Sequence, residues 1–253
     1  MRSNMRMKQF ALTAASICLA TASAAEFRYA DGEQVQYYVE NNIISVFYHE
    51  LGHALVHYLE LPIYGQEEDA ADTLSTYMMH AIWEEESAQA IAYSTAEGYR
   101  IEAALYEPDL TGMHGPDAQR LMNHVCIFYG GDPEARAGFA ADFELPEDRA
   151  ETCVEEFQMA AYSWGTVLEN IENTDGAQTF RLGRTDTATE AGRLITDIMV
   201  QEVADMNKFF RLPETLVIHV EACGEANAFY DPEVREILMC VEYADDLALN
   251  APS

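Results

Sequence analysis

The chain has 253 residues and nearly half of them are apolar, which is enough for one domain with a substantial core and argues against disorder. Only 14 lysines and arginines stand against 44 acidic residues, so the formal net charge is −30. Such a charge repels nucleic acid and anionic lipid, because binding to either depends on neutralising phosphates. We therefore expect no nucleic-acid partner, and an acidic surface of the kind that suits a salty or extracytoplasmic setting.

The first 24 residues have the three parts of a secretory signal peptide. Three of the first eight residues are basic, residues 10–20 are mostly apolar, and residues 22–24 offer a small-x-small cleavage site. The apolar stretch is too short to span a membrane, and no later run of about 18 apolar residues exists. We therefore predict that residues 25–253 form a single domain that is exported, to the periplasm or the medium, without a stable membrane anchor.

Apolar residues at helical spacing dominate the middle of the chain. Pro62 and Gly65 break the first helical pattern, and the acidic residues just after them suit the start of a second helix. Residues 107–116 and 129–146 carry glycine and proline and are expected to be loops. Helices are predicted over residues 41–60, 66–83, 87–105, 117–129, 147–172 and 187–210, the first of them capped by Asn41 or Asn42.

The first predicted helix contains an H-E-x-x-H motif made by His49, Glu50 and His53. Two histidines four residues apart project from one helix face, so both imidazoles can bind one zinc ion, and Glu50 has the position of a general base. The alternative is a polar stripe on a surface helix. His57 lies about 12 Å along the helix axis from His49, too far to share the ion, and Leu59 stands where a longer motif has its third histidine. We interpret His57 as structural.

The third zinc ligand must therefore come from another segment, and the second helix offers candidates. Glu68 and Asp72 lie one turn apart on one face of it. A catalytic zinc takes three protein ligands and a water, and a ligating histidine needs a carboxylate on its other ring nitrogen. We predict that Glu68 is the ligand and that Asp72 is the partner of a ligating histidine. Glu67 and Asp69 remain alternatives for the ligand, and acids at this end of a helix also complement its dipole.

A loop histidine, His114, lies in a Gly-Met-His-Gly-Pro sequence before the fourth predicted helix. A histidine that reaches a zinc site from a loop can stabilise the oxyanion of a tetrahedral intermediate. We therefore name His114 as a candidate catalytic residue. The alternative is a turn residue that faces the solvent.

The pattern changes from helix to strand near the end of the chain. Residues 215–221 are a β-branched run, and the two short runs over 227–231 and 236–240 flank Pro232 as in a hairpin. Before the first helix, only residues 27–29 have the pattern of a strand.

Five cysteines are present, and signal cleavage would remove Cys18. The remaining four in an exported chain are typical of two disulfides, for which three connectivities are possible. No Cys-x-x-Cys spacing occurs, which argues against a zinc site of four thiolates. We predict that neighbours in the sequence pair, Cys126 with Cys153 and Cys223 with Cys240.

The HELGH motif followed by a Glu-x-x-Ala-Asp segment resembles the gluzincin metallopeptidases, in which two histidines and a glutamate bind zinc. More specifically, the segments YHELGHAL, EEDAAD, QRLMNHVCIFYG and CGEANAFYDPEVREILMC resemble a bacterial metallopeptidase family of unknown function, over residues 40–245. The resemblance implies a mixed sheet beside the active-site helix, with an edge strand that pairs with an extended substrate. In that family NAFYDP is expected to precede HELGH, whereas here it follows, so we predict a circularly permuted order.

These observations predict an α+β fold, a mostly helical zincin-like domain. Its small sheet is supplied largely by residues 215–240, which fold back against helix 41–60. The alternative is a separate C-terminal hairpin remote from the zinc.

The function we expect is an exported zinc metallopeptidase that hydrolyses peptide bonds in a peptide or protein substrate. Zinc on His49, His53 and Glu68 would activate a water, and Glu50 would take its proton and pass it to the leaving amine. Two rivals stay open, a catalytically silent zincin-like binding or scaffold module of the cell envelope and a zinc hydrolase of a non-peptide amide. The presence of Glu50 favours an enzyme, since a silent module needs no base beside its ligands.

Overall fold

The computed structural model describes residues 33–252, a mostly helical α+β arrangement with one small mixed sheet. The predicted signal peptide and the strand predicted at 27–29 lie outside the described residues. The helices are α1 (Glu33–Tyr58), α2 (Glu67–Ile82), α3 (Glu85–Leu105), α4 (Asp117–Gly131), α5 (Ala137–Asp142), α6 (Glu147–Asn170), α7 (Glu190–Phe209) and α8 (Val241–Asn250). The strands are β1 (Phe180–Thr185), β2 (Leu216–Glu221), β3 (Ala228–Asp231) and β4 (Glu236–Cys240).

The predicted start of the first helix was wrong, because α1 begins at Glu33. Asn42 is buried inside the helix, where its amide donates to the carbonyl oxygens of Tyr38 and Ser94 and so ties α1 to α3. An asparagine that satisfies its amide in this way does not act as a cap.

Three elements were absent from the sequence-based assignment. The six residues of α5 are too few to show helical periodicity, and α8 follows β4 without a break. Strand β1 reads Phe-Arg-Leu-Gly-Arg-Thr, with few of the β-branched residues that mark a strand. Short length and unusual composition therefore explain all three omissions.

The sheet has the strand order β1-β2-β4-β3, with β3 at one edge. β1 and β4 both run parallel to β2, whereas β3 and β4 form an antiparallel hairpin in which Phe229 faces Leu238. Three of the four strands thus come from the C-terminal segment, as predicted. The fourth, β1, was not predicted from the sequence.

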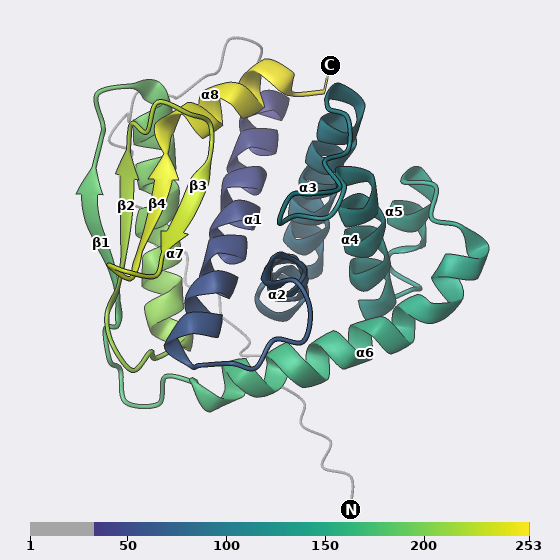
Figure 1. The fold of residues 1–253 in the computed structure, drawn as a ribbon, viewed down its shortest axis with the longest axis horizontal. Helices are drawn as coiled ribbons and strands as arrows, with labels where there is room; N and C mark the ends of the chain where they lie inside the picture. Colours follow the sequence, from purple (N-terminus) through teal and green to yellow (C-terminus); the bar gives the residue numbers. More distant parts are fainter. Residues whose placement is uncertain (1–32, 253) are drawn as a thin grey trace, which may run out of the picture.

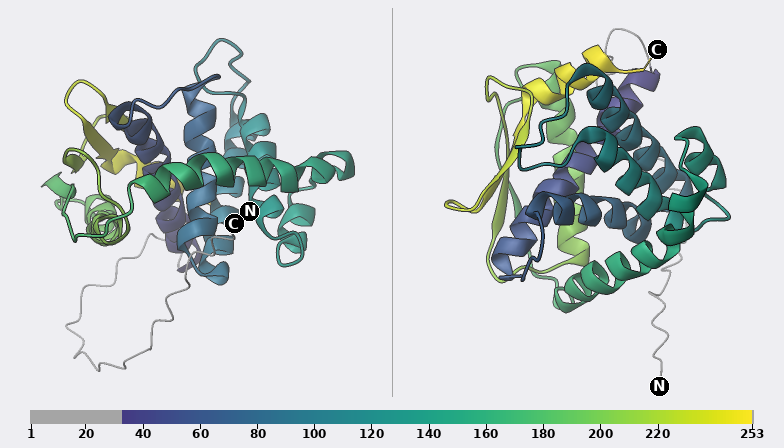
Figure 2. Two further views of the ribbon diagram at one scale, coloured as in Figure 1. Left: turned by 90° about the horizontal axis from the view of Figure 1, so that it is seen from below. Right: turned by 45° about the vertical axis from the view of Figure 1, so that its right-hand side comes forward.

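Helix α1 runs through the middle of the fold, with the sheet and α7 on one side and helices α2 to α6 on the other (Figures 1 and 2). α7 covers the β1 and β2 side of the sheet, while α1 contacts β3 and β4. On its other side α1 packs against α2 and α3, and α6 runs past α2 and α4. The largest core cluster joins both sides through α1, with Phe47, Leu51 and Leu55 buried against residues of the sheet such as Ile218 and Ile237. The C-terminal segment therefore packs on α1, the helix that carries the H-E-x-x-H motif, and the remote hairpin is excluded.

A glycine allows α1 and α2 to approach closely. A Cβ atom at Gly52 would lie 2.8 Å from Cα of Ala71, so any larger residue would push the helices apart. Gly52 stands inside H-E-x-x-H, and Ala71 lies between Glu68 and Asp72. The close contact therefore fixes the first turns of α2 opposite the two histidines.

Two disulfides link neighbours in the sequence, with the pairing predicted above. Cys126–Cys153 ties α4 to α6, and Cys223–Cys240 ties the segment after β2 to the end of β4. Among residues 33–252 no helix is long and apolar enough to cross a membrane.

Candidate metal centre and cleft

Three donor atoms from α1 and α2 converge between the two helices. The Nε2 atoms of His49 and His53 lie 3.2 Å apart, and each is 3.1 Å from Oε2 of Glu68. Tetrahedral zinc with bonds of about 2.0–2.1 Å to nitrogen and oxygen has neighbouring ligands about 3.3–3.4 Å apart. The triangle of donors thus has the size and the chemistry of three corners of a zinc site.

Each histidine is oriented by a carboxylate on its other ring nitrogen. Nδ1 of His49 donates to Asp72 over 2.8 Å, and Nδ1 of His53 donates to Glu67 over 2.8 Å. Both Nε2 atoms are thereby turned toward Glu68, which is the arrangement expected of ligating histidines. From the sequence, Glu67 was considered only as an alternative zinc ligand, and its role as the partner of His53 was missed. Its place next to Glu68 on the first turn of α2 was the one signal for that role.

Asp72 is itself held by two side chains that sequence reasoning left without a role at the site. The Arg120 guanidinium donates to both of its oxygens, over 2.8 and 3.0 Å, and the Tyr99 hydroxyl donates over 3.1 Å. Burial would raise the pKa of Asp72, but its bonds to His49 and Arg120 hold it well below the usual range. Asp72 is therefore a fixed negative charge behind His49.

The carboxylates make the centre favourable for positive charge. Burial lowers the pKa of His49, but hydrogen bonds to Asp72 and Glu68 outweigh burial and raise that pKa to about 9. His53 shows the same balance with Glu68 and Glu67. A field that favours protons on two adjacent imidazoles also favours a divalent cation between them.

Glu50 is buried on the same stretch of α1, 6 % exposed. Burial raises the pKa of its carboxyl group, while His49, His53 and a hydrogen bond from the backbone N–H of Tyr230 act in the opposite direction. Tyr230 belongs to β3, and its hydroxyl also lies 2.6 Å from Nδ1 of His57, two turns further along α1. His57 thus contacts β3 and not the centre, in agreement with its structural interpretation.

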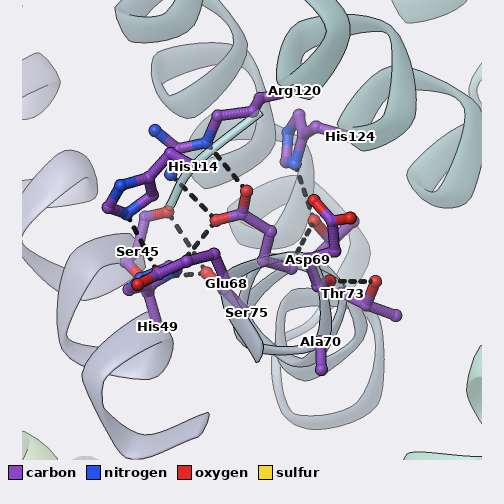
Figure 3. Close-up of polar contacts among 12 residues, drawn as sticks. Ser45, His49, Glu68, Asp69, Ala70, Thr73, Ser75, His114, Arg120 and His124 are labelled. Carbon is purple, nitrogen blue, oxygen red and sulfur yellow. Dashed lines mark hydrogen bonds and ion pairs between the residues drawn. The ribbon is translucent and has the colours of Figure 1, made fainter. Parts of the chain in front are cut away.

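His114 reaches the centre from the loop between α3 and α4 (Figure 3). Its Nε2 lies 2.9 Å from Oε2 of Glu68, and its ring stacks near that of His49 with centroids 5.9 Å apart. One donor atom each of His49, Glu68 and His114 lie within 4.8 Å of one another, so this group could also hold a metal ion. The half-exposed His114 is therefore close enough to contact a ligand of the metal or a bound substrate.

A cleft of about 360 Å³ opens beside this centre, with His49, Glu50, His114 and Arg120 in its wall. The rest of the wall comes from α1, α3, the residues before β3, and α8. The candidate base Glu50, one candidate metal ligand, His49, and the loop residue His114 therefore face one common space.

A protein-family model described as "Putative metallopeptidase" matches residues 7–168 and 184–250. The chain belongs to this family. The matched ranges include the HELGH, EEDAAD and NAFYDP segments, in agreement with the resemblance described above. No curated protein and no solved structure matches the chain. Membership in this family suggests a metal, and the group of His49, Glu68 and His114 could bind one.

Proposed function

We propose that this member of the metallopeptidase family is an exported zinc-dependent peptidase, with His49, His53 and Glu68 as the zinc ligands. The observation that carries the proposal is the triangle of their donor atoms, with sides of 3.1, 3.1 and 3.2 Å, beside a buried glutamate. Bound zinc supplies Lewis-acid chemistry, because it lowers the pKa of a water and polarises a carbonyl group.

Glu50 is the general base of the proposal. It takes a proton from the attacking water and delivers it to the leaving amine. Burial supports this role, since a carboxyl group with a raised pKa holds a proton more readily between the two transfers. The Tyr230 backbone acts against burial and lowers the pKa of Glu50 from the strand side, and Asp72 and Glu67 keep the two histidines in the orientation that leaves Nε2 free for the metal.

His114 is proposed to donate a hydrogen bond to the carbonyl oxygen of the scissile bond as negative charge develops there. Its support is its place in the cleft wall with Glu50, and its ring at 47 % exposure, which a substrate can reach. Strand β3 is proposed to pair with the extended substrate. It is an edge strand with β4 as its single neighbour, and Ala226 and Asn227 just before it line the cleft.

The decisive variant is Glu50→Gln, which removes the proton acceptor but keeps the size and the hydrogen-bond acceptor of the side chain. Metal analysis and hydrolysis of a mixed peptide library are measured on the same preparation. The variant should retain about one zinc per chain and lose at least 100-fold in hydrolysis, since general-base catalysis contributes about 10²–10⁴-fold. An active Glu50→Gln protein would refute the mechanism, and a metal-free wild type would refute the zinc site.

A further inference from the structure

The cleft beside Glu50 combines apolar walls with carboxylates. Its walls carry four tyrosine rings and several aliphatic side chains, namely Tyr38, Tyr99, Tyr106, Tyr243, Val46, Ile101, Leu105 and Leu247. Glu102 from α3 and Asp246 from α8 line the same space. A volume of about 360 Å³ falls in the usual range for ligand pockets, about 300–1,000 Å³.

Neither of these two carboxylates has a cationic partner among residues 33–252. Glu102 is half-buried, and burial together with the neighbouring charges of Asp117 and Asp246 raises its pKa, although Arg120 and His114 act in the opposite direction. Asp246 is exposed at the rim. Two neighbouring carboxylates that make no ion pair repel one another, and a positive group between them would relieve both.

Arg120, the positive side chain in the cleft wall, is already engaged. Its guanidinium makes two hydrogen bonds to Asp72, lies 3.5 Å from a carboxylate oxygen of Asp117, and stacks over the Tyr99 ring at 4.6 Å. The direct contacts of the guanidinium are thus to Asp72 and Asp117, and the carboxylates of Glu102 and Asp246 are left for a ligand to bind.

Resting on the proposed function, we propose that this cleft binds a lysine or arginine side chain of the substrate next to the scissile bond, with its charge held by Glu102 and Asp246. The apolar and aromatic walls suit the methylene stem of such a side chain, and the carboxylates suit its charged end. The net charge of −30 adds a long-range attraction for cationic peptides.

The test compares two sets of fluorescent peptides on one alanine-glycine backbone, with a single arginine or a single glutamine at each position in turn. Binding is measured by anisotropy with the Glu50→Gln protein, and hydrolysis with the wild type. At the preferred position the arginine peptide should bind at least tenfold more tightly than its glutamine partner. Adding Glu102→Gln and Asp246→Asn should reduce this ratio to below about threefold, as expected when a charge-assisted contact is lost.

A matched control removes the same number of charges elsewhere. Glu151→Gln with Glu155→Gln, both exposed on α6, should leave the ratio unchanged, which separates a local contact from the field of the whole chain. If the double variant folds poorly, Asp246→Lys, a change at an exposed position, replaces it. This variant is also expected to abolish the preference for arginine.

Equal binding of the two peptides, or a ratio that survives Glu102→Gln with Asp246→Asn, would overturn the inference. The outcomes also separate it from the proposed function. Arginine-selective binding without any hydrolysis would leave the cleft assignment standing and refute the peptidase. Hydrolysis without preference for arginine would leave the peptidase standing and refute the cleft assignment.

Discussion

The two sides of the candidate centre are assembled over very different distances along the chain. The metal-binding side comes from α1 and α2, between His49 and Asp72. On the other side, the backbone of Tyr230 on β3 acts on the pKa of Glu50, and the cleft wall adds residues of α3, α8 and the segment before β3 to those of α1. Helix periodicity and the short connection between α1 and α2 are enough to define the metal-binding side. The side with Tyr230 and the α8 part of the cleft wall forms only when the C-terminal sheet has folded back on α1. We therefore expect metal binding and substrate positioning to respond differently to substitution.

The largest effect is expected on the metal-binding side, at Glu68. Glu68→Ala removes a donor from the triangle and should weaken zinc by more than the 10–100-fold typical of losing a hydrogen-bond partner of a ligand. Glu67→Ala is the matched control, because this neighbouring side chain is half-exposed and its carboxylate accepts from Nδ1 of His53, the nitrogen turned away from Glu68. Chelator competition measures both affinities. A greater loss in Glu67→Ala than in Glu68→Ala would reverse the assignment of the two residues.

A second effect is expected on the remote side. Cys223→Ser with Cys240→Ser opens the disulfide that braces the end of β4, with a sequence separation of 17 residues. Loss of a loop closure of this size should lower the free energy of unfolding by about 3 kcal/mol, measured by denaturant titration. Zinc affinity of the still-folded variant should stay within a few fold, because no ligand comes from this segment. A collapse of zinc affinity in folded protein would show that the two sides are not separable.

A smaller effect, on the pH dependence of stability, is expected from the difference between two carboxylates, Asp72 and Glu202. Asp72 is balanced by Arg120, whereas Glu202 on α7 accepts a hydrogen bond from Tyr48, which in turn accepts one from Trp83, and has no cation beside it. Burial raises the pKa of Glu202 to about 7. The folded state therefore holds a proton that the unfolded state releases near pH 4.5, and stability falls as the pH rises from about 4.5 to 7.

Glu202→Gln should remove this loss while keeping an acceptor for Tyr48. At pH 8 the variant should be more stable than the wild type by about 2–3 kcal/mol, and at pH 4 the difference should vanish. Denaturant titrations at the two pH values give the comparison. A difference that does not change with pH would mean that Glu202 has the same pKa in the folded and the unfolded protein, and would contradict the prediction.

The same contrast explains what could be predicted from the sequence. The H-E-x-x-H spacing and the Glu68 and Asp72 pair are local patterns, and the structure brings the two histidines of the motif together with Glu68 and Asp72. The C-terminal strands were also evident, because β-branched runs and Pro232 mark them. Tyr230, Arg120 and the cleft wall could not be ranked, since their places depend on the strand order β1-β2-β4-β3 and on the approach of α4 to α2. Strand β1 and helix α8 were not predicted, because their sequences lack a clear hydrophobic periodicity.

The most direct test of the account is the position of the metal in zinc-loaded crystals of the full mature chain, located by anomalous scattering at the zinc edge. The account predicts one strong peak between α1 and α2, about 2.0–2.2 Å from Nε2 of His49, Nε2 of His53 and a carboxylate oxygen of Glu68. A zinc ion bound elsewhere, or no peak at this triangle in fully loaded protein, would contradict it.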